Sequence, residues 1–232
     1  MTAAIVLAGG LGTRLRGEVP DLPKPMAPVA GRPFLEYLLD YWIAQGISRF
    51  VLSVGYRHEA ISGHFGNSYS GVPIDYAIEK LPLGTGGGLV LAAQKLDSAA
   101  PFVVLNGDSY FAVDLEALAA FAQANRADWC FSLFRANEVG RYMSMGVDAD
   151  GRITSLTSGT GAPRWLANGG VYWMGARGPG QFTAGSKLSI EDDIFPAAMA
   201  AGRRLYGLEF TGTFIDIGVP ADYRRAASLL AV

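Results

Sequence analysis

Strand-type and helix-type patterns alternate along most of the chain, and this alternation restricts the fold more than any other feature. Short apolar runs that predict buried strands occupy residues 5–7, 50–54, 74–79, 102–105 and 130–134. Segments with apolar residues at helical spacing lie between them, at residues 33–45, 57–65, 88–96 and 114–125. Such alternation is typical of α/β layers. We therefore predict a Rossmann-like, mostly parallel sheet flanked by helices.

The remaining segments predict additions to this core. Residues 20–33 are rich in proline, which lacks an N–H donor and fixes φ, so we expect an extended loop there. Residues 145–175 combine short strand-like runs with glycine turns, which indicates a mixed, partly antiparallel insertion. A helix over 190–201, a strand pair over 205–217 and a helix over 220–230 complete the pattern. A length of 232 residues predicts one domain over residues 1–232.

Charge and cysteine content exclude several classes of protein. Lys plus Arg number 19 and Asp plus Glu number 21, a net charge of −2, so no basic excess indicates nucleic acid or an anionic membrane as a partner. The apolar runs are much shorter than the ~20 residues of a membrane span. The chain has 1 cysteine, Cys130, which favours a cytoplasmic location over an oxidising one. Cys130 lies in an apolar segment, and we expect it to be buried and unreactive.

The first predicted strand runs directly into the glycine-rich sequence GGLGTRL. Glycines let the backbone approach a ligand closely, and successive amides in such a loop bind anions, so phosphate is the expected ligand. A dinucleotide-binding fingerprint would need a small residue in place of Leu15. A P-loop would need Lys and Ser or Thr in place of Glu18 and Val19. Neither of these nucleotide folds is supported.

Three polar side chains accompany this loop. Thr13 and Arg14 lie within it, and Lys24 follows on the proline-rich segment. A hydroxyl, a guanidinium and an ammonium group can together hold a polyphosphate. From the residues alone, a tight turn with both cations on the surface stays open.

Two aspartates follow apolar strand-like runs. Asp108 ends the sequence NGD after the run at 102–105, and Asp216 lies in FIDIG. Carboxyl ends of strands are where open α/β sheets bind ligands. Two carboxylates from separate strands can converge on Mg²⁺, although either aspartate alone can cap a turn.

The sequence GGLGTRL followed by PKPM resembles the signature of the sugar-1-phosphate nucleotidyltransferases. PLGTGG and FIDIGVPADY extend the resemblance over nearly the whole chain, and it is most similar to the short guanylyltransferases acting on D-glycero-α-D-manno-heptose 1-phosphate. The resemblance implies a GT-A-like nucleotidyltransferase fold. It also implies Mg²⁺-dependent transfer of NMP to a sugar 1-phosphate with release of pyrophosphate. The β-helix module of some relatives, which would show as hexapeptide repeats, is not expected.

The resemblance also implies roles for individual residues. It assigns catalysis to Arg14 and Lys24, and Mg²⁺ binding to Asp108 and Asp216. It assigns nucleotide binding to Leu7, Ala8, Gly9, Gly10, Gly12, Thr13, Glu79, Pro82, Gly84 and Thr85. Sugar-phosphate binding falls to Asn106, Gly107, Asn168, Gly169, Gly170 and Glu191.

Glu79 bears on the choice of base. A carboxylate accepts hydrogen bonds only, so it can pair with both N1–H and the exocyclic amine of guanine. A solvated charge at the strand end, or base contacts from the backbone of Leu7, Gly84 and Thr85, are the alternatives. We expect GTP and heptose 1-phosphate as substrates, and the sequence leaves assembly into a homo-oligomer open.

Three other functions stay open at this point. A mannose-1-phosphate guanylyltransferase and a uridylyl- or thymidylyltransferase are alternatives within the enzyme class. A catalytically silent subunit that binds nucleotide sugars is an alternative of another class. Retention of Arg14, Lys24, Asp108 and Asp216 argues against the silent subunit.

One segment departs from the family pattern. Relatives commonly carry a Glu-Lys pair after the strand equivalent to residues 153–156, with the lysine on the sugar phosphate, whereas this chain reads TSGTGAPRW. Candidate replacements for the lysine are Arg141, Arg164 and Lys187, and the glycine-rich segment is interpretable as a mobile lid. Trp165 is expected in an exposed loop, as an anchor or as a stacking partner of base or sugar.

The other aromatic and ionisable side chains have ordinary interpretations. Trp42, Trp129 and Trp173 lie in apolar patterns and predict core packing. His58 and His64 lack the spacing of a triad or a metal site.

Overall fold

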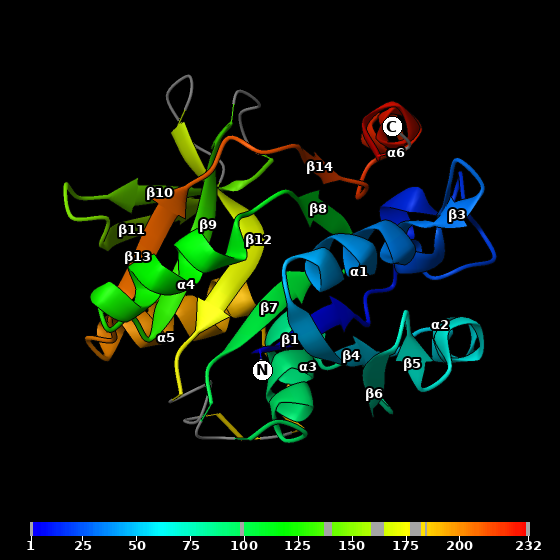
Figure 1. Cartoon of the computed structure of the whole chain (residues 1–232), viewed down its shortest axis with the longest axis horizontal. Coiled ribbons are helices and arrows are strands. Elements are labelled where there is room, and N and C mark those ends of the chain that lie inside the picture. Colours follow the sequence, from blue (N-terminus) through cyan, green and yellow to red (C-terminus); the bar gives the residue numbers. More distant parts are fainter. Residues whose placement is uncertain are drawn as a thin grey trace.

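The computed structural model describes residues 2–97, 100–136, 141–158, 165–176, 182–183 and 185–230. A mixed sheet runs through the middle of the molecule (Figure 1). Its strands are β1 (Thr2–Ala8), β4 (Ile47–Val54), β5 (Ser68–Tyr69), β6 (Val72–Ile78), β7 (Phe102–Asn106), β9 (Trp129–Ala136), β10 (Met143–Val147), β11 (Ile153–Ser158), β12 (Trp165–Met174) and β13 (Leu205–Glu209). The order is β11-β10-β12-β7-β1-β4-β6-β5, and β9 joins β12 to β13. Pairing is parallel between β7, β1, β4 and β6 and antiparallel around β12, as the alternating pattern predicts.

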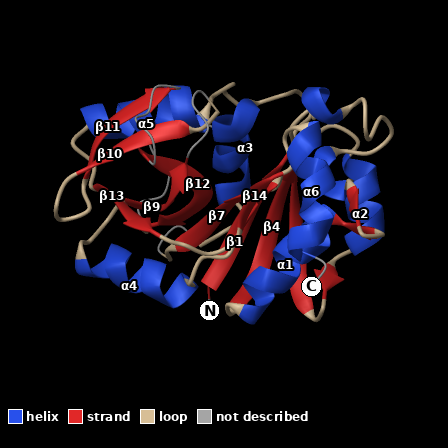
Figure 2. Ribbon diagram, turned by 90° about the horizontal axis from the view of Figure 1, so that it is seen from above, coloured by secondary structure: helices blue, strands red, loops and turns tan. Residues whose placement is uncertain are grey.

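Helices cover both faces of the sheet (Figure 2). Helices α1 (Phe34–Ala44) and α4 (Leu115–Ala124) lie on one face, and α3 (Gly84–Ala93) and α5 (Phe195–Ala200) lie on the other. Successive residues of a strand point to opposite faces, so β4 contributes side chains to the apolar core on each face of the sheet. Phe50 and Leu52 pack with α1, whereas Val51 packs with α3. The indole of Trp42 and the thiol of Cys130 are fully buried, as expected.

Helix α6 (Pro220–Leu230) and two short ribbons lie beside the carboxyl end of β1 (Figure 1). One ribbon pairs β8 (Ser109–Phe111) with β14 (Phe214–Asp216), and the other pairs β2 (Pro28–Val29) with β3 (Arg32–Pro33). The Tyr223 hydroxyl of α6 donates to the Pro28 carbonyl at 2.7 Å. Ala226 of α6 is buried with Val29 and Ile215. Helix α6 therefore ties the proline-rich segment to the strand that ends at Asp216.

Short helical turns and one peripheral helix complete the described chain. They are η1 (Thr13–Leu15), η2 (Lys24–Met26), the π-helical turn η3 (Ile190–Ile194) and α2 (His58–Phe65). None of the helices in the described ranges is both long and apolar enough to cross a membrane.

Four expectations about elements are wrong in detail. Helix α3 begins at Gly84 rather than at residue 88. Its glycines lie where a side chain has no room, since a Cβ on Gly87 would lie 2.4 Å from the Ser186 carbonyl oxygen. The strands predicted over 205–217 do not pair with each other, because β13 joins β9 and β14 joins β8. The predicted helix over 190–201 begins with the π-helical turn η3 and continues directly into α5, and β12 is one long strand of 10 residues rather than short pieces.

Trp165 does not lie in an exposed loop. It begins β12, pairs with Ala136 of β9 and is 8% exposed. Its indole packs with Ala167, Phe134 and Tyr142 in a small apolar cluster. Stacking on a base or sugar is therefore excluded for this side chain in the folded chain described here.

A bulge divides β12 at Gly169–Gly170. The register with β9 shifts between Asn168 and Tyr172, and Gly170 has φ +74°, which favours glycine. A Cβ on Gly170 would lie 2.8 Å from Nδ2 of Asn106. The pairing of Val171 with Leu105 places this bulge at the carboxyl end of β7.

We expect Gly170→Ala to lower the free energy of unfolding more than Gly46→Ala, measured by urea denaturation. Gly46 also has positive φ, at +92°, but a Cβ there meets nothing within 4 Å. Backbone strain alone costs about 1 kcal/mol in Gly46→Ala. Crowding against Asn106 adds about 1–3 kcal/mol in Gly170→Ala. Equal losses for the two variants would contradict the close approach at the bulge.

Candidate active site

A cavity of about 610 Å³ opens at the carboxyl ends of β1 and β7. Most of the predicted site residues line it. They are Leu7, Ala8, Gly9, Gly10, Gly12, Thr13, Arg14, Lys24, Glu79, Pro82, Gly84, Thr85, Asn106, Asp108, Glu191 and Asp216. The loop after one strand and the turn after its neighbour meet here, because Leu7 of β1 pairs with Asn106 of β7.

A second cavity of about 200 Å³ adjoins the first. Asn168, Gly169 and Gly170 of the β12 bulge line it. The two cavities share four lining residues, Asn106, Ser109, Glu191 and Asp216. The predicted nucleotide and sugar residues thus lie in two adjacent cavities with a common wall.

Gly107 is the predicted residue that lines neither cavity. Its N–H donates to the Leu7 carbonyl at 3.0 Å, and a Cβ would lie 2.7 Å from that oxygen. It permits the close approach of the turn after β7 to β1, and this approach places Asp108 at the cavity.

An ion pair joins the proline-rich segment to the sheet. Nζ of Lys24 lies 2.7 Å from Oδ2 of Asp108, and the Lys24 side chain is 12% exposed. Lys24 begins η2, between Pro23 and Pro25, so its backbone is held in place. Arg14 of η1 also lines the cavity and is exposed.

The ribbon of β8 and β14 brings Asp216 to Asp108. Asp216 pairs with Ser109, and the Ile217 N–H donates to the Asp108 carbonyl at 3.0 Å. Burial and the adjacent Asp108 charge raise the pKa of Asp216. The Gly218 N–H, at 2.6 Å from Oδ1, and the charges of Lys24 and Arg141 oppose that rise without cancelling it.

The two carboxylates suit a Mg²⁺ ion that also binds phosphate. Within the part of the chain that the structure describes, no group of three or more His, Cys, Asp or Glu side chains is placed to hold a metal by itself. Mg²⁺ is usually held by one or two carboxylates, with water and substrate phosphates completing the octahedron. Burial is the main cause of the raised pKa of Asp216, and the second cause, repulsion by Asp108, is one that a divalent cation would relieve. Asp108 and Asp216 therefore fit this ion.

Glu79 follows β6 and lines the larger cavity. Its Oε1 accepts from the Ser53 hydroxyl at 3.3 Å, and its Oε2 accepts from the Leu83 N–H at 2.9 Å. Burial raises the pKa of Glu79, and these two hydrogen bonds oppose the rise. A Cβ on Gly9 would lie 2.3 Å from Oε1, so the glycine loop contacts this carboxylate directly. The backbone alternative stays open, since Leu7, Gly84 and Thr85 line the same cavity.

Glu191 connects η3 to the start of α3. The Thr85 hydroxyl donates to Oε2 of Glu191 at 3.2 Å and accepts from the Ile190 N–H at 2.9 Å. Burial raises the pKa of Glu191. Asp192 and Asp193 are exposed and belong to the helix start, where Asp193 accepts from the Ser189 N–H at 2.7 Å.

Several lining residues were not predicted from the sequence. Ser53 and Ser109 are single serines on ordinary strands and carry no motif. Leu11, Pro25 and Gly88 also line the larger cavity. They flank residues that the motifs singled out, so proximity in sequence was the available signal.

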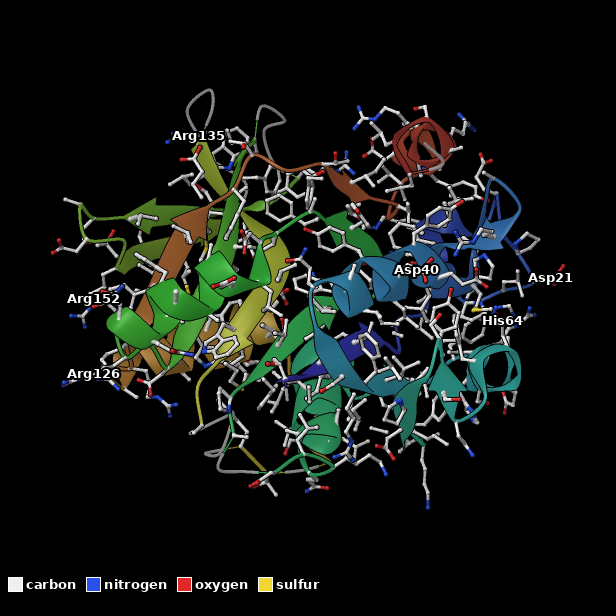
Figure 3. The ribbon with its side chains drawn as sticks, viewed as in Figure 1. Asp21, Asp40, His64, Arg126, Arg135 and Arg152 are labelled. Atoms are coloured by element: carbon white, nitrogen blue, oxygen red, sulfur yellow. The ribbon has the colours of Figure 1, made fainter. Side chains whose placement is uncertain are left out.

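The candidate replacements for the family lysine lie in different places. Lys187 lines the larger cavity and Arg141 lines the smaller one. Arg164, with the glycine-rich segment proposed as a lid, lies outside the described residues. His58 and His64 line neither cavity, and His64 pairs with Glu36 at 2.7 Å on the surface (Figure 3).

Residues 3–231 match the model of the nucleotidyl transferase family. The chain therefore belongs to the nucleotidyl transferase family. The fold agrees with this class, and the glycine loop, the lysine and the two aspartates meet at one sheet edge.

Within the family, the chain is similar to two curated proteins over almost its whole length. It is 39% identical over 223 residues to the D-glycero-α-D-manno-heptose 1-phosphate guanylyltransferase of Aneurinibacillus thermoaerophilus, covering 96% of each chain. It is 37% identical over 220 residues to the protein of that name from Campylobacter jejuni, covering 95% of this chain and 96% of the other. The crystal structure of HddC from Yersinia pseudotuberculosis complexed with GMP-PN is 32% identical, with a TM-score of 0.85 over 98% of this chain and 99% of the other.

We expect Glu191→Gln to raise the free energy of unfolding at pH 8, because it removes a charge that burial disfavours. The raised pKa means that the folded protein binds this proton more tightly than the unfolded chain. The destabilisation is therefore full above the folded-state pKa and vanishes below the unfolded value, about 4.3. The difference from wild type should shrink as the pH falls from about 8 to about 4.5, measured by urea unfolding.

Glu116→Gln is the matched control. Glu116 is exposed in the first turn of α4, where the helix dipole favours its charge. Its substitution should slightly lower the free energy of unfolding at pH 8. A Glu191→Gln protein that is less stable than wild type at pH 8 would show that the buried charge is not the dominant effect.

Proposed function

We propose that the chain transfers GMP from GTP to D-glycero-α-D-manno-heptose 1-phosphate, giving GDP-heptose and pyrophosphate. One observation carries the proposal. The glycine loop, Lys24, Asp108 and Asp216 line one cavity in a chain that is 39% identical, over 96% of its length, to an enzyme named for this substrate.

The larger cavity is the proposed GTP site. The loop amides of residues 9–13, with Arg14 and Lys24, supply positive charge and donors for the triphosphate. Glu79 faces the base in this proposal. Ser53 and Leu83 fix its two oxygens, and each carboxylate oxygen can accept more than one hydrogen bond, so both remain able to accept from guanine.

The proposed chemical step is an in-line displacement at phosphorus. An oxygen of the sugar 1-phosphate forms a bond to the α-phosphorus of GTP, and the bond to the β-phosphate oxygen breaks, so pyrophosphate leaves with the electron pair. The nucleophile is already ionised and needs no general base. The residues of the chain align two anions and reduce their repulsion, which Lys24, Arg14 and the loop amides do by charge and hydrogen bonds.

Mg²⁺ is the proposed cofactor, held by Asp108 and Asp216. When bound, it neutralises phosphate charge and orients the phosphates. Lys24 has a separate task, because its ion pair with Asp108 keeps that carboxylate at the cavity.

The setting of the reaction is part of the proposal. The substrates are small phosphorylated molecules of the cytoplasm, where we place the protein. GDP-heptose would be consumed in the synthesis of a capsule or another surface polysaccharide.

We expect wild-type protein with Mg²⁺ to release pyrophosphate from GTP and heptose 1-phosphate. The measurement crosses GTP, ATP, UTP, CTP and dTTP with the 1-phosphates of heptose, mannose, glucose and N-acetylglucosamine. GTP-dependent turnover confined to the heptose supports both substrates. A preference for mannose 1-phosphate would contradict the assignment of the sugar, and a preference for UTP or dTTP would contradict the assignment of the base. No turnover with any pair would favour a silent binding subunit.

Asp108→Asn assigns any activity to this cavity. The substitution removes a charge that pairs with Lys24, and we expect kcat to fall by about 10²–10³. His64→Gln is the control, since His64 lines neither cavity and should leave kcat unchanged.

We expect Glu79→Gln to raise the KM for GTP more than the KM for other triphosphates. The amide can donate as well as accept, so one of the two contacts to guanine is replaced by two donors facing each other. Steady-state kinetics with GTP and UTP measure the effect. An unchanged preference for GTP would transfer base recognition to the backbone of Leu7, Gly84 and Thr85.

A further inference from the structure

The bulge in β12 brings together two side chains that a regular strand would keep apart. Asn168 pairs with Leu133 of β9 and Tyr172 pairs with Phe131, so four steps along β12 correspond to two steps along β9. In a regular strand, residues four apart are separated by about 13 Å. Here Nδ2 of Asn168 lies 2.9 Å from the phenol oxygen of Tyr172. The bulge is therefore what makes this contact possible.

Two contacts fix the orientation of the Asn168 amide. The Gly170 N–H can only donate, and it lies 3.1 Å from Oδ1 of Asn168. The oxygen must therefore lie on that side of the amide, and Nδ2 donates to the phenol oxygen of Tyr172. An amide has two N–H donors and two acceptor lone pairs, so these two contacts leave one donor and one lone pair. Asn168 lines the smaller cavity, where this fixed amide is presented to a ligand.

Tyr172 lies behind the cavity wall. It is fully buried and lines neither cavity. Its ring packs edge to face against Phe131 and Phe195, with 5.5 Å between the ring centres in each pair. A ring packed in this way keeps its hydroxyl in one place. Tyr172 can therefore act on a ligand only through the side chains in front of it.

A second amide of the site contacts the same phenol. Asn106 ends β7, which pairs with β12 (Figure 1), and it lines both cavities. Burial and the charge of Glu191 raise the pKa of Tyr172, and hydrogen bonds from the Asn168 and Asn106 amides oppose that rise. A Cβ on Gly170 would lie 2.8 Å from Nδ2 of Asn106, so the bulge also packs against this amide. Both asparagines that the family resemblance assigns to sugar-phosphate binding thus share one buried hydroxyl.

We propose that Tyr172 is a positioning residue of the sugar site, which holds the amides of Asn168 and Asn106 in the orientation that binds hydroxyl groups of the sugar 1-phosphate. The inference rests on the proposed function and deepens it, because it names a residue that controls sugar binding without contacting the sugar. A sugar offers its hydroxyl groups at fixed places on a ring, and amides bind them well only when they are held at matching positions.

The first test is Tyr172→Phe, which removes one oxygen and keeps the packed ring. Asn168 then loses one of its two described partners, and we expect the KM for heptose 1-phosphate to rise about 3–10-fold. The KM for GTP should change little, because Asn168 lines the smaller cavity and not the larger one. Steady-state kinetics with each substrate varied in turn measure the two values. Equal rises in both KM values, or an unchanged KM for the sugar 1-phosphate, would overturn the assignment.

The second test is a double-mutant cycle with Asn168→Ala. This variant should raise the KM for the sugar 1-phosphate at least as much as Tyr172→Phe does. In the Asn168→Ala background, Tyr172→Phe should have a smaller effect than in the wild type, because only the Asn106 amide remains to be released. Additive effects would show that Tyr172 does not act through Asn168. Thermal unfolding of every variant verifies that the folded state persists.

Tyr76→Phe is the matched control for loss of a tyrosine hydroxyl. The Tyr76 hydroxyl donates to the Gly66 carbonyl at 2.6 Å, and Tyr76 lines neither cavity. Both KM values should stay at the wild-type level. A rise in the KM for the sugar 1-phosphate here as well would show that a general loss of stability, and not the contact with Asn168, raises that KM.

Wild-type turnover separates failure of this inference from failure of the proposed function. If another sugar 1-phosphate is the substrate, the same comparison is made with that sugar. If no pair is turned over, calorimetry compares the Kd values of wild type and Tyr172→Phe for the four sugar 1-phosphates. Equal Kd values, or no binding by the wild type, would overturn the role of Tyr172.

Discussion

The ion pair between Lys24 and Asp108 joins two segments that are 84 residues apart and closes the cavity between them. It contributes little net stability, because desolvation of two charges offsets most of their attraction. Its main effect is to fix the positions of Lys24 and Asp108 at the cavity. Lys24 is brought to the sheet edge by a proline-rich segment that α6 fastens through Tyr223, and its charge also lowers the repulsion between Asp108 and Asp216. Without this contact, Asp108 would lose the cation that pairs with it in the described chain.

The parallel strands and the bulged strand β12 have different tasks in building the site. β1 and β7 run in register, so the glycine loop and the turn with Asp108 emerge together. β12 runs antiparallel to β7, and its bulge, which lies between Asn168 and Tyr172 in the pairing with β9, is at that same edge. Asn168 then accepts from the Gly170 N–H and donates to the Tyr172 hydroxyl. The bulge residues line the smaller cavity beside the larger one.

Sequence reasoning was strongest where local pattern and tertiary structure agree. The alternation of strands and helices predicted the layers, and the motifs named most of the lining residues, because both depend on short-range features. Prediction from the sequence failed where packing between distant segments determines the local structure. Trp165 follows a polar, glycine-rich segment, yet β12 continues to it and buries it against Phe134. The glycine-rich sequence at the start of α3 is typical of a loop. It is helical here, and Ser186 and Leu188 approach the helix so closely that they leave no room for a side chain at these glycines. Ser53 carries no motif and Asp222 has no assigned role within FIDIGVPADY, so only the folded chain shows that they contact Glu79 and Arg141.

Three acidic groups of the site, Glu79, Glu191 and Asp216, have pKa values raised mainly by burial, so each is costly to keep ionised in the folded protein. This cost falls on residues that line the two cavities, and favourable packing elsewhere must offset it. The two apolar clusters on either face of the sheet do so, since β4 alone contributes buried residues to both. Ligand binding would give the same acids further partners. In the proposed reaction, guanine donors satisfy Glu79, sugar hydroxyls satisfy Glu191 and a divalent cation satisfies Asp216. Substrate binding would then offset the free-energy cost of keeping these acids ionised in a buried site. The folded protein would therefore be more stable with its ligands bound than without them.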